Sequence, residues 1–314
     1  MIFIKNLIKD LKVTDTTNFG IQRKIVANMT TESWERIPHA VFTYRPDVSK
    51  FLNEYELMAF DKNRTKKITL NTLMLKVIVE GIKAAPQING HIEYNRHLVR
   101  GEVRQIENIN ISMPWLLPSG EMMTINLKNF ENKSLEEMAN YIENVAKKIE
   151  NTNFTEVMFE VSMDNTITTL KQGNIFTPIC RLIGSKTGKH KIITLRGRER
   201  QNYYKIPEKH RLTKSDIEQG TITVSNIGSI YKEHRGEINL MEIIPPQLVA
   251  IGLSAVQEQP GICVSSNGEK YVDIIKVMPI TIAFDHRALD FGDVIPFLKR
   301  LDDIFENPKP IHSW

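Results

Sequence analysis

The chain has 314 residues, of which 41% are hydrophobic and 25% charged, a composition typical of a folded globular protein that excludes a disordered or fibrous chain. Its only two cysteines, Cys180 and Cys263, exclude a disulfide framework and a four-cysteine zinc site, so we expect a reducing, cytoplasmic environment. The formal net charge of +4 is unevenly spread, because eight basic residues stand against two acidic ones between Lys186 and Lys209.

Residues 1–19 are predicted to contain an N-terminal amphipathic helix. Apolar residues recur on one helical face, namely Phe3, Ile4, Leu7, Ile8 and Leu11. Lysines interrupt this run and no small-residue cleavage site follows, so a signal peptide is not expected. We expect the apolar face to dock on the protein itself; binding to a membrane or a partner is the alternative. No stretch of about 18 uncharged apolar residues occurs, so we expect no membrane partner.

Three later stretches show helical periodicity, at residues 70–82, 135–149 and 294–305. The second follows Ser134 and contains Glu137, a spacing that predicts a capping box satisfying two backbone donors. Before the third, Asp293 is the expected N-cap. That start would place Pro296 in the first turn, where the missing N–H of proline costs nothing.

Strands are predicted at residues 40–47, 106–114, 221–226, 248–256 and 277–284, which are short runs rich in apolar or β-branched residues. Residues 262–265 and 271–275 flank Asn267-Gly268, the favoured pair for a two-residue type I′ hairpin turn. The mixture of helices and strands predicts a mixed α/β layer structure around a large sheet. Residues 151–209, which contain the basic cluster, show little clear periodicity.

The most informative polar cluster follows the last predicted strand, in the sequence Asp285-His286-Arg287-Ala288-Leu289-Asp290. A histidine with a carboxylate four residues later, at the end of an apolar strand, is a common way to aim a general base into a cleft. The alternative is a structural turn in which Asp290 or Asp293 caps the next helix. Two ligands are too few for a metal site, so no metal is expected.

Four stretches in a fixed order resemble a known family. They read RKIVANM with IPHAVFTYRPDV (within 23–48), LMLKVIVEGIKAAPQING (73–90), LTKSDIEQGTITVSNIGSI with IIPPQLVAIG (212–230 and 243–252) and AFDHRALD (283–290). From about Gly20 to its end, the chain resembles the catalytic core of the 2-oxo acid dehydrogenase acyltransferases, which share a fold with chloramphenicol acetyltransferase. The resemblance implies a two-layer α/β sandwich with a large mixed sheet.

The resemblance also implies roles for three residues. His286 matches the general base, which would take the thiol proton of coenzyme A or dihydrolipoamide. An imidazole with a pKa near about 6.5 is suited to a thiol with a pKa of about 8.5. Ser225 matches the hydroxyl that stabilises the oxyanion, although a serine in a structural strand-end turn is the alternative. Asp290 matches the family's second acidic position, which supports the site through a salt bridge.

Substrate or coenzyme A contacts are expected from four further positions, Arg23, His39, Asn226 and Gly228. Arg23 is the expected salt-bridge partner of Asp290, with a solvated helix residue as the alternative. His39 would line the acyl channel, or else be a structural histidine. In this family the site lies between subunits, with the histidine from one chain and the serine from its neighbour, so we expect a homotrimer or a multiple of trimers.

Two features depart from the family pattern. Phe291 follows Asp290 where family members usually have glycine, and residues 151–209 replace a much shorter connection, which we interpret as a basic insertion. Within the chain we expect no lipoyl and no peripheral-subunit-binding domain, so a lipoyl carrier domain would act in trans. The basic cluster is a candidate for the phosphates of coenzyme A, or else a solvated face; we expect no nucleic-acid partner.

The sequence therefore predicts a coenzyme A-dependent acyltransferase that uses acyl-coenzyme A as substrate and a dihydrolipoyl-type thiol as acceptor. Two alternatives stay open at this point. One is a non-catalytic trimeric scaffold, suggested by Phe291 and by the missing carrier domain. The other is an acetyltransferase for a small alcohol or an antibiotic, against which the Asp-His-Arg string weighs.

Overall fold

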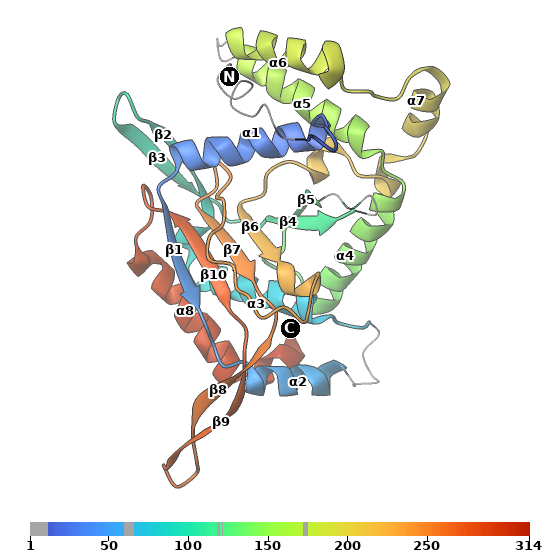
Figure 1. Ribbon diagram of the computed structural model, residues 1–314. Helices are drawn as coiled ribbons and strands as arrows, with labels where there is room; N and C mark the ends of the chain where they lie inside the picture. Colours follow the sequence, from blue (N-terminus) through green and yellow to red (C-terminus); the bar gives the residue numbers. More distant parts are fainter. Residues whose placement is uncertain (1–11, 60–65, 118–119, 121, 172–174) are drawn as a thin grey trace.

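The computed structural model describes residues 12–59, 66–117, 120, 122–171 and 175–314, and its centre is a six-stranded mixed sheet (Figure 1). In spatial order the strands are β1 (His39–Tyr44), β10 (Ile280–Asp285), β7 (Val249–Leu253), β6 (Ile222–Asn226), β4 (Ile111–Leu116) and β5 (Met122–Leu127). Strand β6 runs parallel to β7 and β4, and the other neighbours are antiparallel. All the strands predicted for this sheet are present, and β5 was not predicted.

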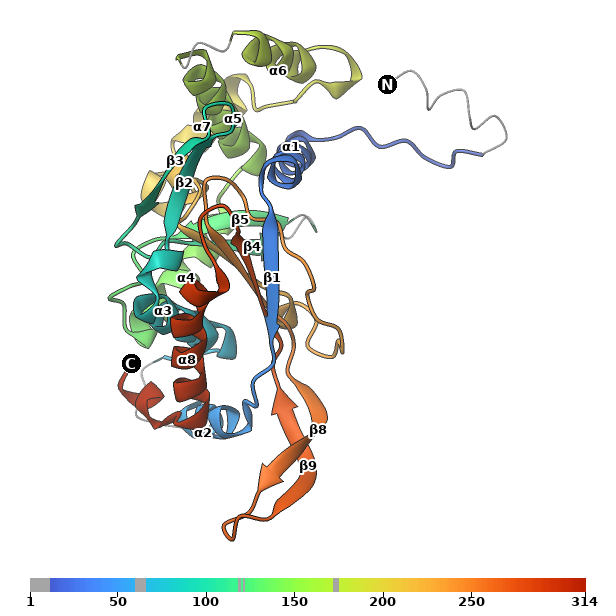
Figure 2. The same cartoon turned by 90° about the vertical axis from the view of Figure 1, so that its left-hand side faces the viewer.

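A layer of helices covers one face of the sheet (Figure 2). It consists of α2 (Ser49–Ala59), α3 (Leu70–Ala84), α4 (Leu135–Glu150) and α8 (Phe291–Glu306). The main hydrophobic core lies between these layers, and alternate residues of the central strands, such as Ile251 and Ile282, point into it. This arrangement confirms the predicted two-layer α/β sandwich.

The opposite face of the sheet carries a second, smaller apolar cluster. There Ala250 and Ala283 of the sheet pack against Met241 and Ile243, which belong to the long connection between β6 and β7. A side chain at Gly252 would collide with Ile238 and Met241, because a Cβ would lie 2.6 Å from each. The β6–β7 connection is therefore packed against β7 and β10, and His286 follows directly after β10.

The helix predictions hold for α3 and α4, and Ser134 and Glu137 form the expected capping box. For α8 the predicted start was wrong, because the helix begins at Phe291 with Asp290 as its N-cap. Asp293 sits at the third helical position, where its Oδ2 accepts the backbone N–H of Asp290 at 2.8 Å. Pro296 consequently lies inside the helix rather than in its first turn.

Two hairpins stand apart from the central sheet: β2 (Gly90–Asn95) with β3 (Arg100–Gln105), and β8 (Gln257–Val264) with β9 (Lys270–Val277). The predicted β8–β9 pairing is present, but its turn is not the two-residue type. The backbone N–H of Gly268 donates to Ser265 O, and within this turn only Gly268 has a positive φ, of 84°. This is the longer loop in which a turn is followed by a left-handed glycine, so the type I′ prediction was wrong.

Residues 151–209 are largely helical and lie beside α1 (Ile21–Arg36), at one end of the molecule (Figure 1). They form α5 (Phe154–Lys171), α6 (Phe176–Lys186) and α7 (Gly197–Tyr204). The apolar face predicted at Phe3–Leu11 falls outside the described residues, and residues 12–19 form neither helix nor strand. None of the helices within the described ranges has the length and apolar character needed to cross a bilayer.

Candidate active site

His286 lies in the tight turn between β10 and α8. Its backbone N–H donates to Pro38 O at 3.1 Å, and its ring Nδ1 lies 3.1 Å from Leu289 O and 3.3 Å from Asp290 Oδ1. A carbonyl oxygen can only accept, so the neutral ring carries its proton on Nδ1. This tautomer leaves the lone pair on Nε2, and the side chain is 55% exposed. The Nε2 atom of His286 can therefore accept a proton from a molecule that binds at this exposed ring.

An ion pair that the sequence analysis did not single out holds this turn together. Asp285 is fully buried, and its carboxylate accepts from the backbone N–H of Arg287 at 3.0 Å and from the guanidinium at 2.5 to 3.1 Å. Its backbone oxygen accepts from Leu289, whose own oxygen faces His286 Nδ1. The Asp-His-Arg string therefore contains both the exposed imidazole and the pair that positions it.

Asp290 has two roles in the structure. It caps α8, which the sequence analysis kept as an alternative, and it lies beside Nδ1 of His286. Its side chain is 83% exposed. Asp290 is therefore placed to orient the ring and to stabilise it when protonated, whereas Nε2 remains available to a substrate.

Phe291, the departure from the family pattern, is the first residue of α8. Its ring packs on Phe42 of β1 with the centroids 5.0 Å apart. The aromatic side chain thus joins the start of α8 to the edge strand, and the turn that carries His286 keeps its hydrogen bonds.

The serine expected to stabilise the oxyanion lies at the other end of the sheet. Ser225 pairs with Gly252 on β7, and Gly252 pairs with Thr281 on β10. His286 follows Thr281 by five residues, so the two sites are about 17 Å apart along the strand direction alone at about 3.4 Å per residue. One chain therefore does not bring His286 and Ser225 together, as expected if the site is completed by a neighbouring subunit.

The neighbours of Ser225 have mainly structural contacts. Asn226 donates from Nδ2 to Asn71 Oδ1 on α3 at 2.8 Å and accepts the backbone N–H of Ser229 at 3.0 Å. Gly228 lies against the connection between β7 and β8, because a Cβ at this position would come within 2.7 Å of Ala255 N. Both residues fix the end of β6, and so the position of Ser225.

His39 is held on both ring nitrogens. Nδ1 faces Ile37 O at 2.8 Å, Nε2 accepts the backbone N–H of Ile243 at 3.1 Å, and the ring stacks on Trp34. These contacts favour the structural alternative, in which His39 connects α1 to the β6–β7 connection.

Arg23 lies in the first turn of α1. Pro38, whose oxygen accepts the backbone N–H of His286, follows the opposite end of that helix. Among the ion pairs of the described residues, Asp290 pairs with His286 and none joins it to Arg23. The predicted pairing is therefore not made within one chain. The same part of the chain shows no cluster of three or more His, Cys, Asp or Glu side chains arranged to hold a metal ion.

Comparison with solved structures shows the same fold. The chain aligns with the cubic core of the pyruvate dehydrogenase multienzyme complex at a TM-score of 0.64 and 16% identity, covering 98% of this chain and 96% of that one. A probable dihydrolipoamide acetyltransferase from Listeria monocytogenes aligns at a TM-score of 0.57 and 18% identity, over 95% of both chains. These matches confirm the fold that the sequence predicts.

Curated relatives carry related names. The dihydrolipoyllysine-residue acetyltransferase component of the Saccharomyces cerevisiae pyruvate dehydrogenase complex is 22% identical over 91% of this chain and 45% of its own length. The succinyltransferase component of the Pseudomonas aeruginosa 2-oxoglutarate dehydrogenase complex is 32% identical over 34% of this chain and 24% of its own. The chain thus spans less than half the length of these relatives.

A family model described as the catalytic domain of the 2-oxoacid dehydrogenases acyltransferase matches residues 12–179 and 187–313. The match runs through the 151–209 segment except for residues 180–186, so it sets no boundaries for the expected insertion, which stays a prediction. Because the match covers nearly the whole chain, the protein belongs to the family defined by the catalytic domain of the 2-oxoacid dehydrogenase acyltransferases.

Proposed function

We propose that the protein transfers an acyl group between coenzyme A and a dihydrolipoyl-type thiol, with His286 as general base. The observation that carries this proposal is the Nδ1 contact to Leu289 O, which leaves Nε2 as the basic nitrogen on an exposed ring. Family membership and the names of the relatives support the substrate classes.

The mechanism follows from this tautomer. Nε2 removes the proton of the attacking thiol, and the thiolate forms a bond to the thioester carbonyl carbon of the other partner. The carbonyl oxygen becomes an oxyanion, which the hydroxyl of a neighbouring subunit's Ser225 would stabilise as a hydrogen-bond donor. When the tetrahedral intermediate collapses, the other sulfur leaves and takes the proton back from the imidazolium. A thioester is already activated, so no metal is required.

Self-assembly into trimers, or multiples of trimers, is part of the proposal. The distance between His286 and Ser225 within one chain supports a site shared between copies. The β8–β9 hairpin also supports it, because apolar side chains are exposed on it: Ile262 by 73%, Val272 by 73% and Ile274 by 70%. We further propose that a lipoyl carrier domain brings the acceptor, that Arg23 pairs with Asp290 across the subunit boundary, and that the setting is the cytoplasm.

The test measures thioester formation from acetyl- or succinyl-coenzyme A and free dihydrolipoamide. Replacing His286 by Ala should lower kcat by about a hundredfold to ten-thousandfold, the usual contribution of a general base. His97→Ala is the matched control, because His97 lies in the exposed β2–β3 turn. Turnover unchanged in His286→Ala would overturn the assignment. A wild-type protein that neither transfers acyl groups nor binds coenzyme A in calorimetry would instead support the scaffold alternative.

A further inference from the structure

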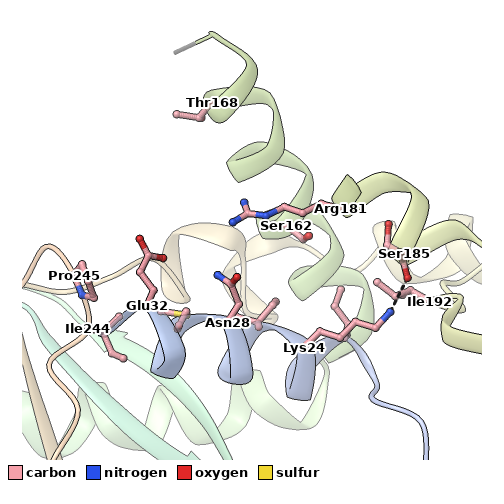
Figure 3. A pocket seen from close by; sticks show the side chains of 14 residues that line it. Lys24, Asn28, Glu32, Ser162, Thr168, Arg181, Ser185, Ile192, Ile244 and Pro245 are labelled. Carbon is pink, nitrogen blue, oxygen red and sulfur yellow. Dashed lines mark hydrogen bonds between the residues drawn. The ribbon is translucent and has the colours of Figure 1, made fainter. Parts of the chain in front are cut away.

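A pocket among the described residues lies away from the proposed catalytic residues. It has a volume of about 590 Å³ and is formed between α1 on one side and α5 and α6 on the other, with Ile244 and Pro245 at one end (Figure 3). Its size falls within the range of about 300 to 1,000 Å³ that is usual for small-molecule sites. None of His286, Asp290, Ser225 and Asn226 lines it.

The polar part of this pocket includes two cationic side chains, Lys24 and Arg181, and one carboxylate, Glu32. Arg181 extends from α6 over the space above α1, and Asn28 rises toward it from α1 (Figure 3). Within the part of the chain that the structure describes, the Arg181 guanidinium makes no hydrogen bond and no ion pair. Lys24 lies at the same wall and donates to Gly184 O at 3.0 Å. The one lining carboxylate, Glu32, is paired with Arg36 at 2.7 Å.

The remaining lining is partly apolar and partly hydroxylic. Ile25, Met29 and Ile192 supply apolar surface, and Ser162 and Ser185 supply hydroxyls. The Arg181 guanidinium is exposed and has no partner among the described residues, and beside such a surface it matches a ligand that has an anionic group at one end and an apolar part at the other.

We propose that this pocket binds a small anionic amphiphile, with its phosphate or carboxylate on Arg181 and its apolar part against α1. The pocket shares no lining residue with the proposed catalytic machinery. A phosphate group could belong to a free amphiphile or to the nucleotide end of coenzyme A. The two sources share the same chemistry at Arg181, and the experiment distinguishes them.

Isothermal titration of the full chain with octyl phosphate, below the concentration at which it forms micelles, measures binding directly. Octyl glucoside serves as the neutral analogue and should bind at least tenfold more weakly. Arg181→Gln should weaken octyl phosphate binding at least tenfold. Arg96→Gln is the matched control, because it removes the same charge from an exposed position in the β2–β3 turn, outside the pocket, and should change binding by less than twofold.

A second variant tests the location of the site. Gly184 lines the pocket, and a Cβ at this position would meet no atom within 4 Å, so Gly184→Leu can be accommodated without a backbone clash. Its bulk should block octyl phosphate while the thermal midpoint without ligand is kept. Displacement of octyl phosphate by adenosine 3′,5′-bisphosphate would assign the anion to coenzyme A, and a lack of displacement would assign it to a free amphiphile. Equal affinity for octyl phosphate and octyl glucoside, or unchanged binding in both variants, would overturn the proposal.

Discussion

The buried Asp285 fixes the turn that positions the exposed His286. Its carboxylate is fully buried and receives two kinds of donor from Arg287, the backbone N–H and the guanidinium. The Arg287 guanidinium is also 5.7 Å from the centre of the Tyr94 ring, in the β2–β3 hairpin. The same turn also places Leu289 O beside His286 Nδ1. Loss of the Asp285–Arg287 ion pair should therefore change the orientation of the imidazole, although neither residue contacts the ring through its side chain. Asp285 and Arg287 are thus positioning residues.

Asp285→Asn should lower kcat with little change in KM, since the amide keeps the shape of the side chain but not its charge. We expect a loss of about 2 to 3 kcal/mol in the free energy of unfolding, below the range for a fully buried pair because part of Arg287 is exposed. Urea denaturation and steady-state kinetics measure the two effects. The double variant Asp285→Asn with Arg287→Met should recover part of the stability, since no unpaired charge remains. Wild-type turnover in Asp285→Asn would contradict the positioning role.

His91 gives the fold a dependence on pH. Burial of its ring lowers its pKa below the usual value, although its contact with Gly220 O acts in the opposite direction. A depressed histidine pKa favours the neutral ring in the folded state, so this stability is present above about pH 6.5 and is lost as the pH falls below it. One proton allows a slope of at most about 1.4 kcal/mol per pH unit.

His91→Gln should flatten this part of the pH profile between about pH 7 and pH 5. Glutamine can still donate to Gly220 O but does not titrate. Chemical denaturation at several pH values compares the two proteins, with His97→Ala as an exposed-histidine control. An identical slope in His91→Gln and the wild type would show that other groups cause the pH dependence.

At the scale of elements, α7 is attached to α5 through a buried carboxylate. Glu156 is 1% exposed, accepts the backbone N–H of Leu195, and lies 3.7 Å from the guanidinium of Arg200. Tyr204 of α7 donates to Glu160 of α5, and burial, together with this hydrogen bond, raises the pKa of its phenol to about 12. Leu195, Arg200 and Tyr204 therefore attach this segment to the acidic residues of α5.

Glu156→Ala should release this segment, because it leaves the Leu195 N–H without its acceptor at a cost of about 1 to 3 kcal/mol. The readout is limited trypsin cleavage at Arg196, Arg198 and Lys205, which should become faster. The midpoint of the main thermal unfolding transition should change little. Glu156→Gln keeps an acceptor oxygen and should give an intermediate rate. Unchanged cleavage in Glu156→Ala would mean that other contacts hold α7.

The elements that the sequence predicts are those with a strong local pattern. Helices α3 and α4 have apolar residues at helical spacing, and most of α3 is buried. Helix α1 was missed because only Ile21 and Ser33 of its residues are buried, so apolar and polar positions do not separate into faces. Strand β3 was missed because all six residues are exposed. The start of α8 depended on choosing between two aspartates three residues apart, both of which fit a cap.

For the candidate site, local spacing was sufficient to select His286 and Asp290, because both contacts form within one turn. It did not select the Asp285–Arg287 pair, which is informative only when the burial of Asp285 is known. The relation of Ser225 to His286 depends on the order and register of three strands, which no local pattern encodes. Whether they act together is therefore a property of the whole molecule.

At the scale of the whole molecule, the separation of His286 from Ser225 predicts that two inactive variants can complement each other in a mixed oligomer. His286→Ala and Ser225→Ala should each be nearly inactive alone. Mixed after joint unfolding and refolding, or co-expressed at equal amounts, they should regain activity in mixed assemblies. If each site takes its histidine from one subunit and its serine from the next, about a quarter of the sites receive both intact residues.

The expected activity is thus about a quarter of the wild-type value for the same number of chains. Mixing the two variants without dissociation is the control and should give no recovery, since subunits have not exchanged. A double variant that carries both substitutions in one chain, mixed with wild type, distinguishes true complementation from simple dilution. Sites contained within single chains would show no recovery from the two single variants, because every chain then lacks one of the two groups.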